Sequence, residues 1–77
     1  MKEIKKNTQT ERNSISLALK YYLGEGVEQN HSKAFELFKE AAEQGYADAQ
    51  HNVGVMYSSG EGVKQDYVEA FKWFKKA

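Results

Sequence analysis

The chain has 77 residues, of which 40% are hydrophobic and 13% aromatic, and its eleven basic and eleven acidic side chains cancel. This composition is too apolar for a disordered chain, and the length allows one small domain that buries only about 60% of its unfolded surface. The balanced charge excludes the basic footprint of a general nucleic-acid or anionic-membrane binder, so we expect neither partner.

The chain has no cysteine and only two histidines, His31 and His51. Disulfides and thiolate zinc sites are therefore excluded, and no acidic pair completes a metal site, so we expect no metal and no cofactor. The start lacks the apolar segment of a secretory signal, which favours a cytoplasmic location, and the apolar stretch at residues 15–23 is too short to span a bilayer. Since neither a disulfide nor a metal site cross-links so small a core, we expect neighbouring protein to stabilise it.

The chain opens with a polar segment, residues 1–8, which we expect to be flexible. A first helix is predicted from about Gln9 to Leu23, with Thr8 as its N-cap. The stretch "GEGV" then ends this helix, because Gly24 can adopt the left-handed conformation without a Cβ clash and Gly26 allows a second sharp turn.

A second helix is predicted between Asn30 and Gly45, because apolar side chains in the stretch "KAFELFKEAAEQG", residues 33–45, recur every three or four positions. Asn30 is a favourable N-cap residue, and Gly45 follows the pattern as a C-terminal stop. We expect Val27 to fill the gap between these two antiparallel helices.

The second half of the chain repeats the first at an offset of 36 positions, since Tyr21 and Gln29 return as Tyr57 and Gln65 and "GEGV" occurs twice. The offset predicts a third helix at about residues 47–59, ended by a left-handed Gly60, and a fourth helix with Asp66 as its N-cap. Asp66 and Glu69 have the spacing of a capping box. A period of 20 to 50 residues is typical of solenoids, in which each unit buries its apolar face against its neighbours. The identity extends beyond the loop, so it indicates a duplicated structural unit rather than a duplicated active loop.

The stretch "ADAQHNVGVMYSSGEGVKQDYVEAFKWFKKA", residues 47–77, resembles the Sel-one-like repeats, relatives of the tetratricopeptide repeats. The matching positions, in order, are Val53-Gly54, Tyr57, the "GEGV" loop, Trp73 and Lys76-Ala77. Residues 14–46 resemble a more diverged copy, in which Leu17-Ala18 replaces Leu-Gly and Leu37 replaces Trp. We expect residues 9–45 to form the first repeat and residues 46–77 a second one that is incomplete at its C-terminal end.

This resemblance implies an all-α fold, a right-handed, tetratricopeptide-like α-solenoid fragment of two helix-turn-helix repeats with about four antiparallel helices. It also implies a non-enzymatic adaptor or scaffold for protein–protein interaction, with the first helix of each repeat along a concave groove. Leu17, Ala18 and Tyr21 are then expected to pack on the second helix.

Other positions on the first helices are candidates for a groove that binds a protein segment. They are Ile15, Leu19, Tyr22, Leu23, Asp48, His51, Asn52, Val55 and Ser58. A groove with an apolar and a polar half suits an extended peptide or a partner helix. The alternative for the aliphatic half is that the N-terminal residues or a twin subunit cover it.

Three aromatic residues, Phe71, Trp73 and Phe74, are candidates for an exposed edge or an oligomer interface, with the core as the alternative for Trp73. Two repeats are fewer than the three usually needed for a self-sufficient stack. We therefore expect a homo-oligomer, a module stabilised by a protein or peptide partner, or a truncated array.

No Ser-His-acid or Cys-His arrangement is suggested by the spacing, so we expect no enzymatic activity. The alternative to an interaction module is a small inhibitor or immunity-type protein that occludes one specific target. A hydrolase is the third hypothesis, but the family members proposed to act on cell-wall or antibiotic substrates are rich in cysteine, which this chain lacks.

Overall fold

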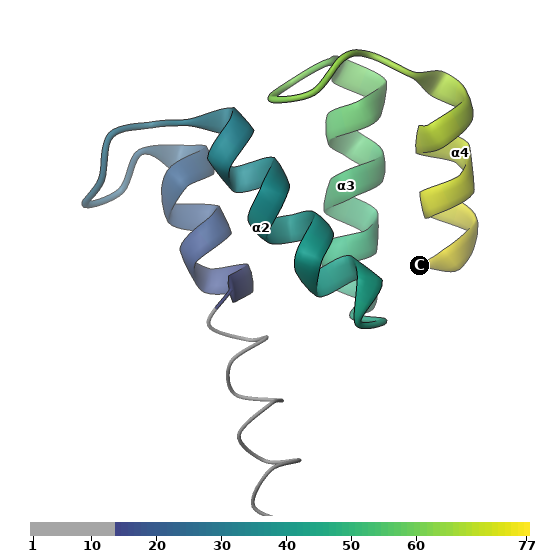
Figure 1. Cartoon of the computed structure of the whole chain (residues 1–77), viewed down its shortest axis with the longest axis horizontal. Coiled ribbons are helices and arrows are strands. Elements are labelled where there is room, and N and C mark those ends of the chain that lie inside the picture. The colour runs from purple at the N-terminus through teal and green to yellow at the C-terminus, as the bar shows by residue number, and fades with distance from the viewer. Residues whose placement is uncertain (1–13) are drawn as a thin grey trace, which may run out of the picture.

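A computed structural model describes residues 14–77, and all the regular structure in that range is helical. Residues 14–23 belong to a helix, called here the N-terminal helix, and α2 (His31–Glu43), α3 (Ala47–Ser59) and α4 (Tyr67–Lys76) follow it (Figure 1). The predicted polar segment 1–8, the Thr8 cap and the helix start near Gln9 lie outside the described residues.

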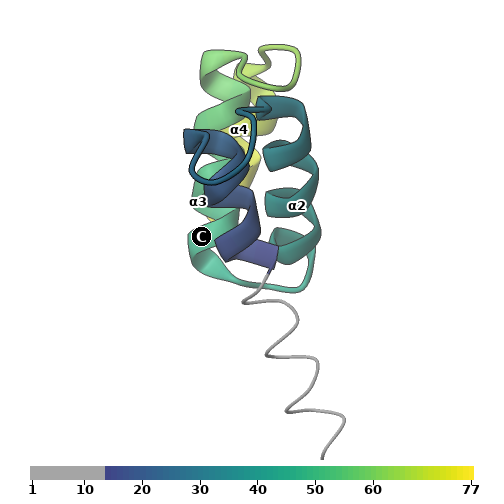
Figure 2. The same cartoon turned by 90° about the vertical axis from the view of Figure 1, so that its left-hand side faces the viewer.

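The helices form two antiparallel hairpins, the N-terminal helix with α2 and α3 with α4 (Figure 1). Helix α3 packs against both α2 and α4, so it joins the two hairpins. Figure 2 shows the N-terminal helix and α3 on the same side of the molecule, with α2 on the other side. The expected all-α solenoid of two helix-turn-helix repeats is therefore confirmed, and the first helices of the two repeats share one face.

The two "GEGV" loops are built in the same way. Gly60 ends α3 with a left-handed φ of 77°, and its N–H donates to the Met56 carbonyl over 2.7 Å. Gly24 also has a φ of 77° and donates to Lys20 over 2.7 Å. Helix ends leave backbone carbonyls without intrahelical partners, and a left-handed glycine brings the next N–H groups back onto them. The predicted role of these glycines is confirmed.

The repeated glutamine of the loop has a role that the sequence did not indicate. The Gln29 side-chain amide donates to the Tyr22 carbonyl over 3.0 Å, and Gln65 donates in the same way to Ser58 over 2.9 Å. Each glutamine thus satisfies a free carbonyl in the last turn of the preceding helix. The loop is therefore anchored to the helix it leaves, which holds the next helix in a constant position.

The predicted N-caps are confirmed for α2 and α4. Asn30 accepts a hydrogen bond from the Lys33 N–H, and Asp66 accepts from the N–H groups of Val68 and Glu69. A capping box would also return a bond to the Asp66 N–H. That N–H donates to the Tyr57 carbonyl instead, over 2.8 Å, so only one half of the capping box forms.

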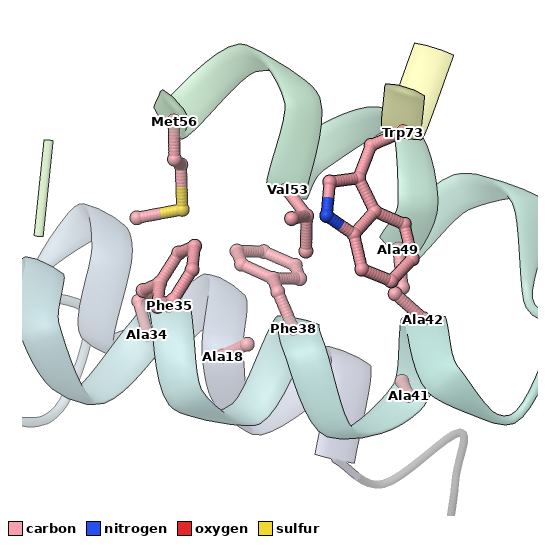
Figure 3. Packing of buried hydrophobic residues seen from close by; sticks show 10 residues of the cluster. All are labelled: Ala18, Ala34, Phe35, Phe38, Ala41, Ala42, Ala49, Val53, Met56 and Trp73. Carbon is pink, nitrogen blue, oxygen red and sulfur yellow. The ribbon is translucent and has the colours of Figure 1, made fainter. Parts of the chain in front are cut away.

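The core lies between α2 and α3 and receives one side chain from each outer helix, Ala18 and Trp73. Figure 3 shows Phe35 and Phe38 of α2 directed toward α3. Trp73 is only 8% exposed, so its assignment to the exposed edge is wrong and the core alternative is correct. It faces back toward α3, which is the helix that covers it.

The other two edge residues behave differently from their counterparts one repeat earlier. Phe35 is 8% exposed and Phe38 2%, whereas Phe71 is 64% exposed and Phe74 39%. The cause is position, because α3 covers this face of α2 and no described element covers the same face of α4. Leu17, expected to pack on the second helix, is 39% exposed for the related reason that no described helix precedes it, while its counterpart Val53 is fully buried.

Candidate protein-binding groove

A pocket of about 90 Å³ opens between the first helices of the two repeats. Leu19 and Tyr22 of the N-terminal helix form one wall, and residues of α3 form the other. The pocket is lined by six residues: Leu19, Tyr22, Phe38, Asn52, Val55 and Met56. The pocket exists because the loops place the two first helices side by side, so that side chains 33 positions apart, such as Leu19 and Asn52, face one space.

Asn52 is the polar group of this pocket. Its side chain is half-buried, and its carboxamide makes no hydrogen bond to the described residues. A carboxamide offers two donor hydrogens and an acceptor oxygen, the same groups that a peptide backbone presents in reverse.

Tyr22 is held in place by the second repeat. Its hydroxyl donates to Glu61 Oε1 over 2.7 Å, and its ring stacks on His31 with 4.7 Å between the ring centroids. The bond to the Glu61 carboxylate is the main reason that the pKa of Tyr22 is raised, with burial contributing to the same effect. The same bond lowers the pKa of Glu61, and Ser59 and His31 lower it further. One wall of the pocket is therefore fixed by a contact between repeats.

Four of the nine predicted groove residues, Leu19, Tyr22, Asn52 and Val55, meet in this pocket. Two lining residues, Phe38 and Met56, were missing from the prediction. Met56 follows Asn52 by four positions, which is the spacing of one helix face and could have suggested it. Phe38 carried no such signal, because it lies on the second helix of its repeat; it lines the pocket and also belongs to the core cluster.

The other five candidates lie outside the pocket. Ile15 packs against the core cluster, and Leu23 is 54% exposed. His51 lies beside α4, with its ring centroid 5.6 Å from that of Phe74. Ser58 donates to the Val55 carbonyl over 2.8 Å, and Asp48 is exposed in the first turn of α3.

Residues 14–77 contain no group of three His, Cys, Asp or Glu side chains that is suited to hold a metal ion. None of their helices combines the length and the apolar character that crossing a membrane requires.

The family model of the Sel1 repeat matches residues 15–46 and residues 47–77, which together cover most of the chain. The chain belongs to the Sel1 repeat family. Sel1 repeat proteins generally mediate protein–protein interactions, and their fold is typically a non-enzymatic interaction module.

Solved structures of this family resemble the chain closely. One is a protective antigen present in uropathogenic Escherichia coli strains that displays an SLR fold, with 41% identity and a TM-score of 0.86. Another is a Sel1 repeat protein from Oxalobacter formigenes, with 38% identity and a TM-score of 0.85. The matches cover 91% and 90% of this chain, but the chain spans only 15% and 28% of those two proteins. No curated protein matches it.

Proposed function

We propose that this pair of Sel1 repeats is a non-enzymatic interaction module that binds an extended protein segment in the groove between its first helices. The pocket at Asn52 carries the proposal, because an open apolar pocket with one free polar group is the usual form of a site that takes one side chain of a peptide. No catalytic step is included, since the other polar group of the pocket, the Tyr22 hydroxyl, is already bonded to Glu61.

The volume of the pocket limits which side chain it accepts. An apolar cavity of about 150 Å³ holds benzene, which has six carbons, so about 90 Å³ corresponds to roughly three or four carbons. Valine, leucine or isoleucine fits this size, whereas phenylalanine and tryptophan are too large. The partner segment is therefore expected to present one aliphatic side chain at this point.

The surroundings of the pocket favour an extended peptide. The Asn52 carboxamide can pair with the backbone on either side of the anchoring residue, which is accessible only in an extended chain. Leu19 and Leu23, one helical turn apart, are 42% and 54% exposed. They provide an apolar wall along which neighbouring residues of the segment can pack.

Synthetic peptides that are identical except for Ala, Val, Leu, Phe or Trp at one central position test the proposal. Amide chemical-shift changes measured during titration are expected to give roughly fiftyfold tighter binding for Leu than for Ala, since Leu buries three more carbons and each contributes ~0.8 kcal/mol. Phe and Trp are expected to bind no better than Ala.

Two valine substitutions supply the matched control. Val55→Trp fills the pocket and is expected to abolish the preference for Leu, whereas Val68→Trp, at a position 65% exposed on α4, is expected to leave it unchanged. Binding that ignores the central residue, or a Leu preference that survives Val55→Trp in a folded variant, would show that this pocket is not the site.

A further inference from the structure

The two ends of the molecule carry exposed apolar surfaces that the groove does not use. The C-terminal face consists of Phe71 and Phe74 on α4, which are 64% and 39% exposed. The N-terminal face consists of Leu17, Lys20 and Tyr21 on the N-terminal helix. Leu17 is 39% exposed, Lys20 is exposed, and Tyr21 is half-buried against the core cluster. The two faces correspond to the two sides of the internal interface between α2 and α3, because the repeat places equivalent residues on them.

The interface between α2 and α3 shows how two such faces fit together. The rings of Phe35 and Tyr57 meet edge to face, with centroids 5.2 Å apart and planes at 85°. Phe38 lies in the same core cluster as Val53 and Met56, and all three are at most 2% exposed. Figure 3 shows the two phenylalanines of α2 directed toward these residues of α3.

The five residues named above each have a counterpart 36 positions away on one of the two end faces. Phe71 and Phe74 take the places of Phe35 and Phe38. On the N-terminal helix, Tyr21 takes the place of Tyr57, Leu17 that of Val53 and Lys20 that of Met56. The C-terminal face of one molecule and the N-terminal face of another therefore hold equivalent side chains to the internal interface, with Leu17 in place of Val53 and Lys20 in place of Met56.

The loops show the same relation between neighbouring repeats. A Cβ atom at Gly62 would overlap the backbone of His31 and Ser32, so the second loop lies directly against the start of α2. A Cβ atom at the equivalent Gly26 would meet nothing within 4 Å. The space beside Gly26 is where the start of α4 from another molecule would lie, since Tyr67 is the counterpart of His31.

We propose that the C-terminal face binds the N-terminal face of a second copy of this chain, in the same register as α2 binds α3. Phe71 then meets Tyr21, and Phe74 meets Leu17. Lys20 weakens this contact relative to the internal interface, although its methylene stem can lie on the apolar surface while its ammonium group stays in water. Pairing of two C-terminal faces is disfavoured, because Lys75, whose ammonium group lies 5.4 Å from the centroid of the Phe71 ring, would approach its counterpart in the second molecule.

Contact between two different faces leaves one of each kind free on the dimer, so the assembly is open-ended. The weight-average mass of the chain in sedimentation is accordingly expected to rise with concentration and to pass twice the 8.8 kDa of one chain without a plateau. A monomer at every concentration up to about 1 mM overturns the proposal.

Two complementary variants identify the faces. Leu17→Glu removes the N-terminal face, and Phe71→Glu removes the C-terminal face; each variant alone is expected to be a folded monomer by circular dichroism and sedimentation. An equimolar mixture retains one intact face of each kind and is expected to form a dimer that grows no further. If Leu17→Glu associates on its own, or if the mixture stays monomeric, the proposal fails.

Lys20→Met tests the same contact without any risk to the fold, because Lys20 is exposed. This variant restores the methionine of the internal interface and is expected to lower the concentration of half-association about tenfold. Lys64→Met, in an exposed loop position, is the control and is expected to leave association unchanged. Equal behaviour of the two variants contradicts the proposal, and neither variant alters the groove, so the peptide-binding proposal is tested separately.

Discussion

Alanine substitution of the second glycine in each "GEGV" loop tests how closely the second loop packs against the first repeat. Gly26 and Gly62 have φ values of 77° and 74°, so alanine at either position is forced into the left-handed region. That conformation costs roughly 1–2 kcal/mol for a residue with a Cβ atom. This part of the loss in the free energy of unfolding is expected to be the same for both variants.

A second loss in the free energy of unfolding, caused by steric overlap, is expected only for Gly62→Ala. Its Cβ atom would overlap the His31 carbonyl and lie 2.9 Å from the Ser32 nitrogen, and both are backbone atoms that cannot turn away. Overpacking of this kind costs typically about 1–3 kcal/mol. We therefore expect Gly26→Ala to lose about 1–2 kcal/mol and Gly62→Ala about 2–5 kcal/mol, which is a large part of the stability of so small a domain.

Urea denaturation followed by circular dichroism, at a concentration where the chain is monomeric, measures both losses. The matched pair removes the conformational cost from the comparison, since only the surroundings of the two glycines differ. Equal losses within about 0.5 kcal/mol would refute the reasoning, because they would mean that the second loop does not lie against the start of α2 in solution.

Three further predictions concern the same features. Phe38→Ala is expected to cost ~3–5 kcal/mol in urea denaturation, and Phe74→Ala clearly less, because Phe38 is 2% exposed and Phe74 39%; equal costs would contradict the assigned burial. Asp66→Ala is expected to cost ~1 kcal/mol in the same assay, since it removes the acceptor for two N–H groups of α4, and an unchanged midpoint would argue against that cap. The folded-state pKa of Glu61 is lowered from its usual 4.5, chiefly by its bond to Tyr22, so this bond stabilises the fold above pH 4.5 and the stabilisation is lost as the pH falls through the folded-state pKa. Melting temperatures of the wild type and Glu61→Gln should therefore differ at pH 7 and converge as the pH falls below that pKa.

The polar contact between Tyr22 and Glu61 links the groove to the stacking of the repeats. Glu61 belongs to the second loop and Tyr22 to the first repeat, so any change in how the repeats stack moves one wall of the pocket. Adding further repeats at either end would leave the bond between Tyr22 and Glu61 in place, because it joins the two repeats of one chain. The groove and the end faces are thus separate surfaces, and the bond between Tyr22 and Glu61 belongs to the groove.

The sequence by itself determined the helices and their ends. The start of α3 and its end at Ser59, the caps at Asn30 and Asp66 and the left-handed Gly60 were all predicted correctly. These features depend on interactions within a few residues, such as a side chain that accepts from the next turn or a glycine that tolerates a positive φ. Local chemistry of this kind is readable in one short stretch of chain.

Burial and the shape of the pocket were decided only by the tertiary structure. Phe35 and Phe71 occupy the same register in the same motif, yet one is 8% and the other 64% exposed, because only one of them lies under another helix. Trp73, by contrast, is buried because α3 covers it. The bond between Tyr22 and Glu61 joins residues that are 39 positions apart in the sequence. In a stack of repeats, the neighbour that covers each face sets the exposure of its residues, and the residue pattern within one repeat cannot specify that neighbour.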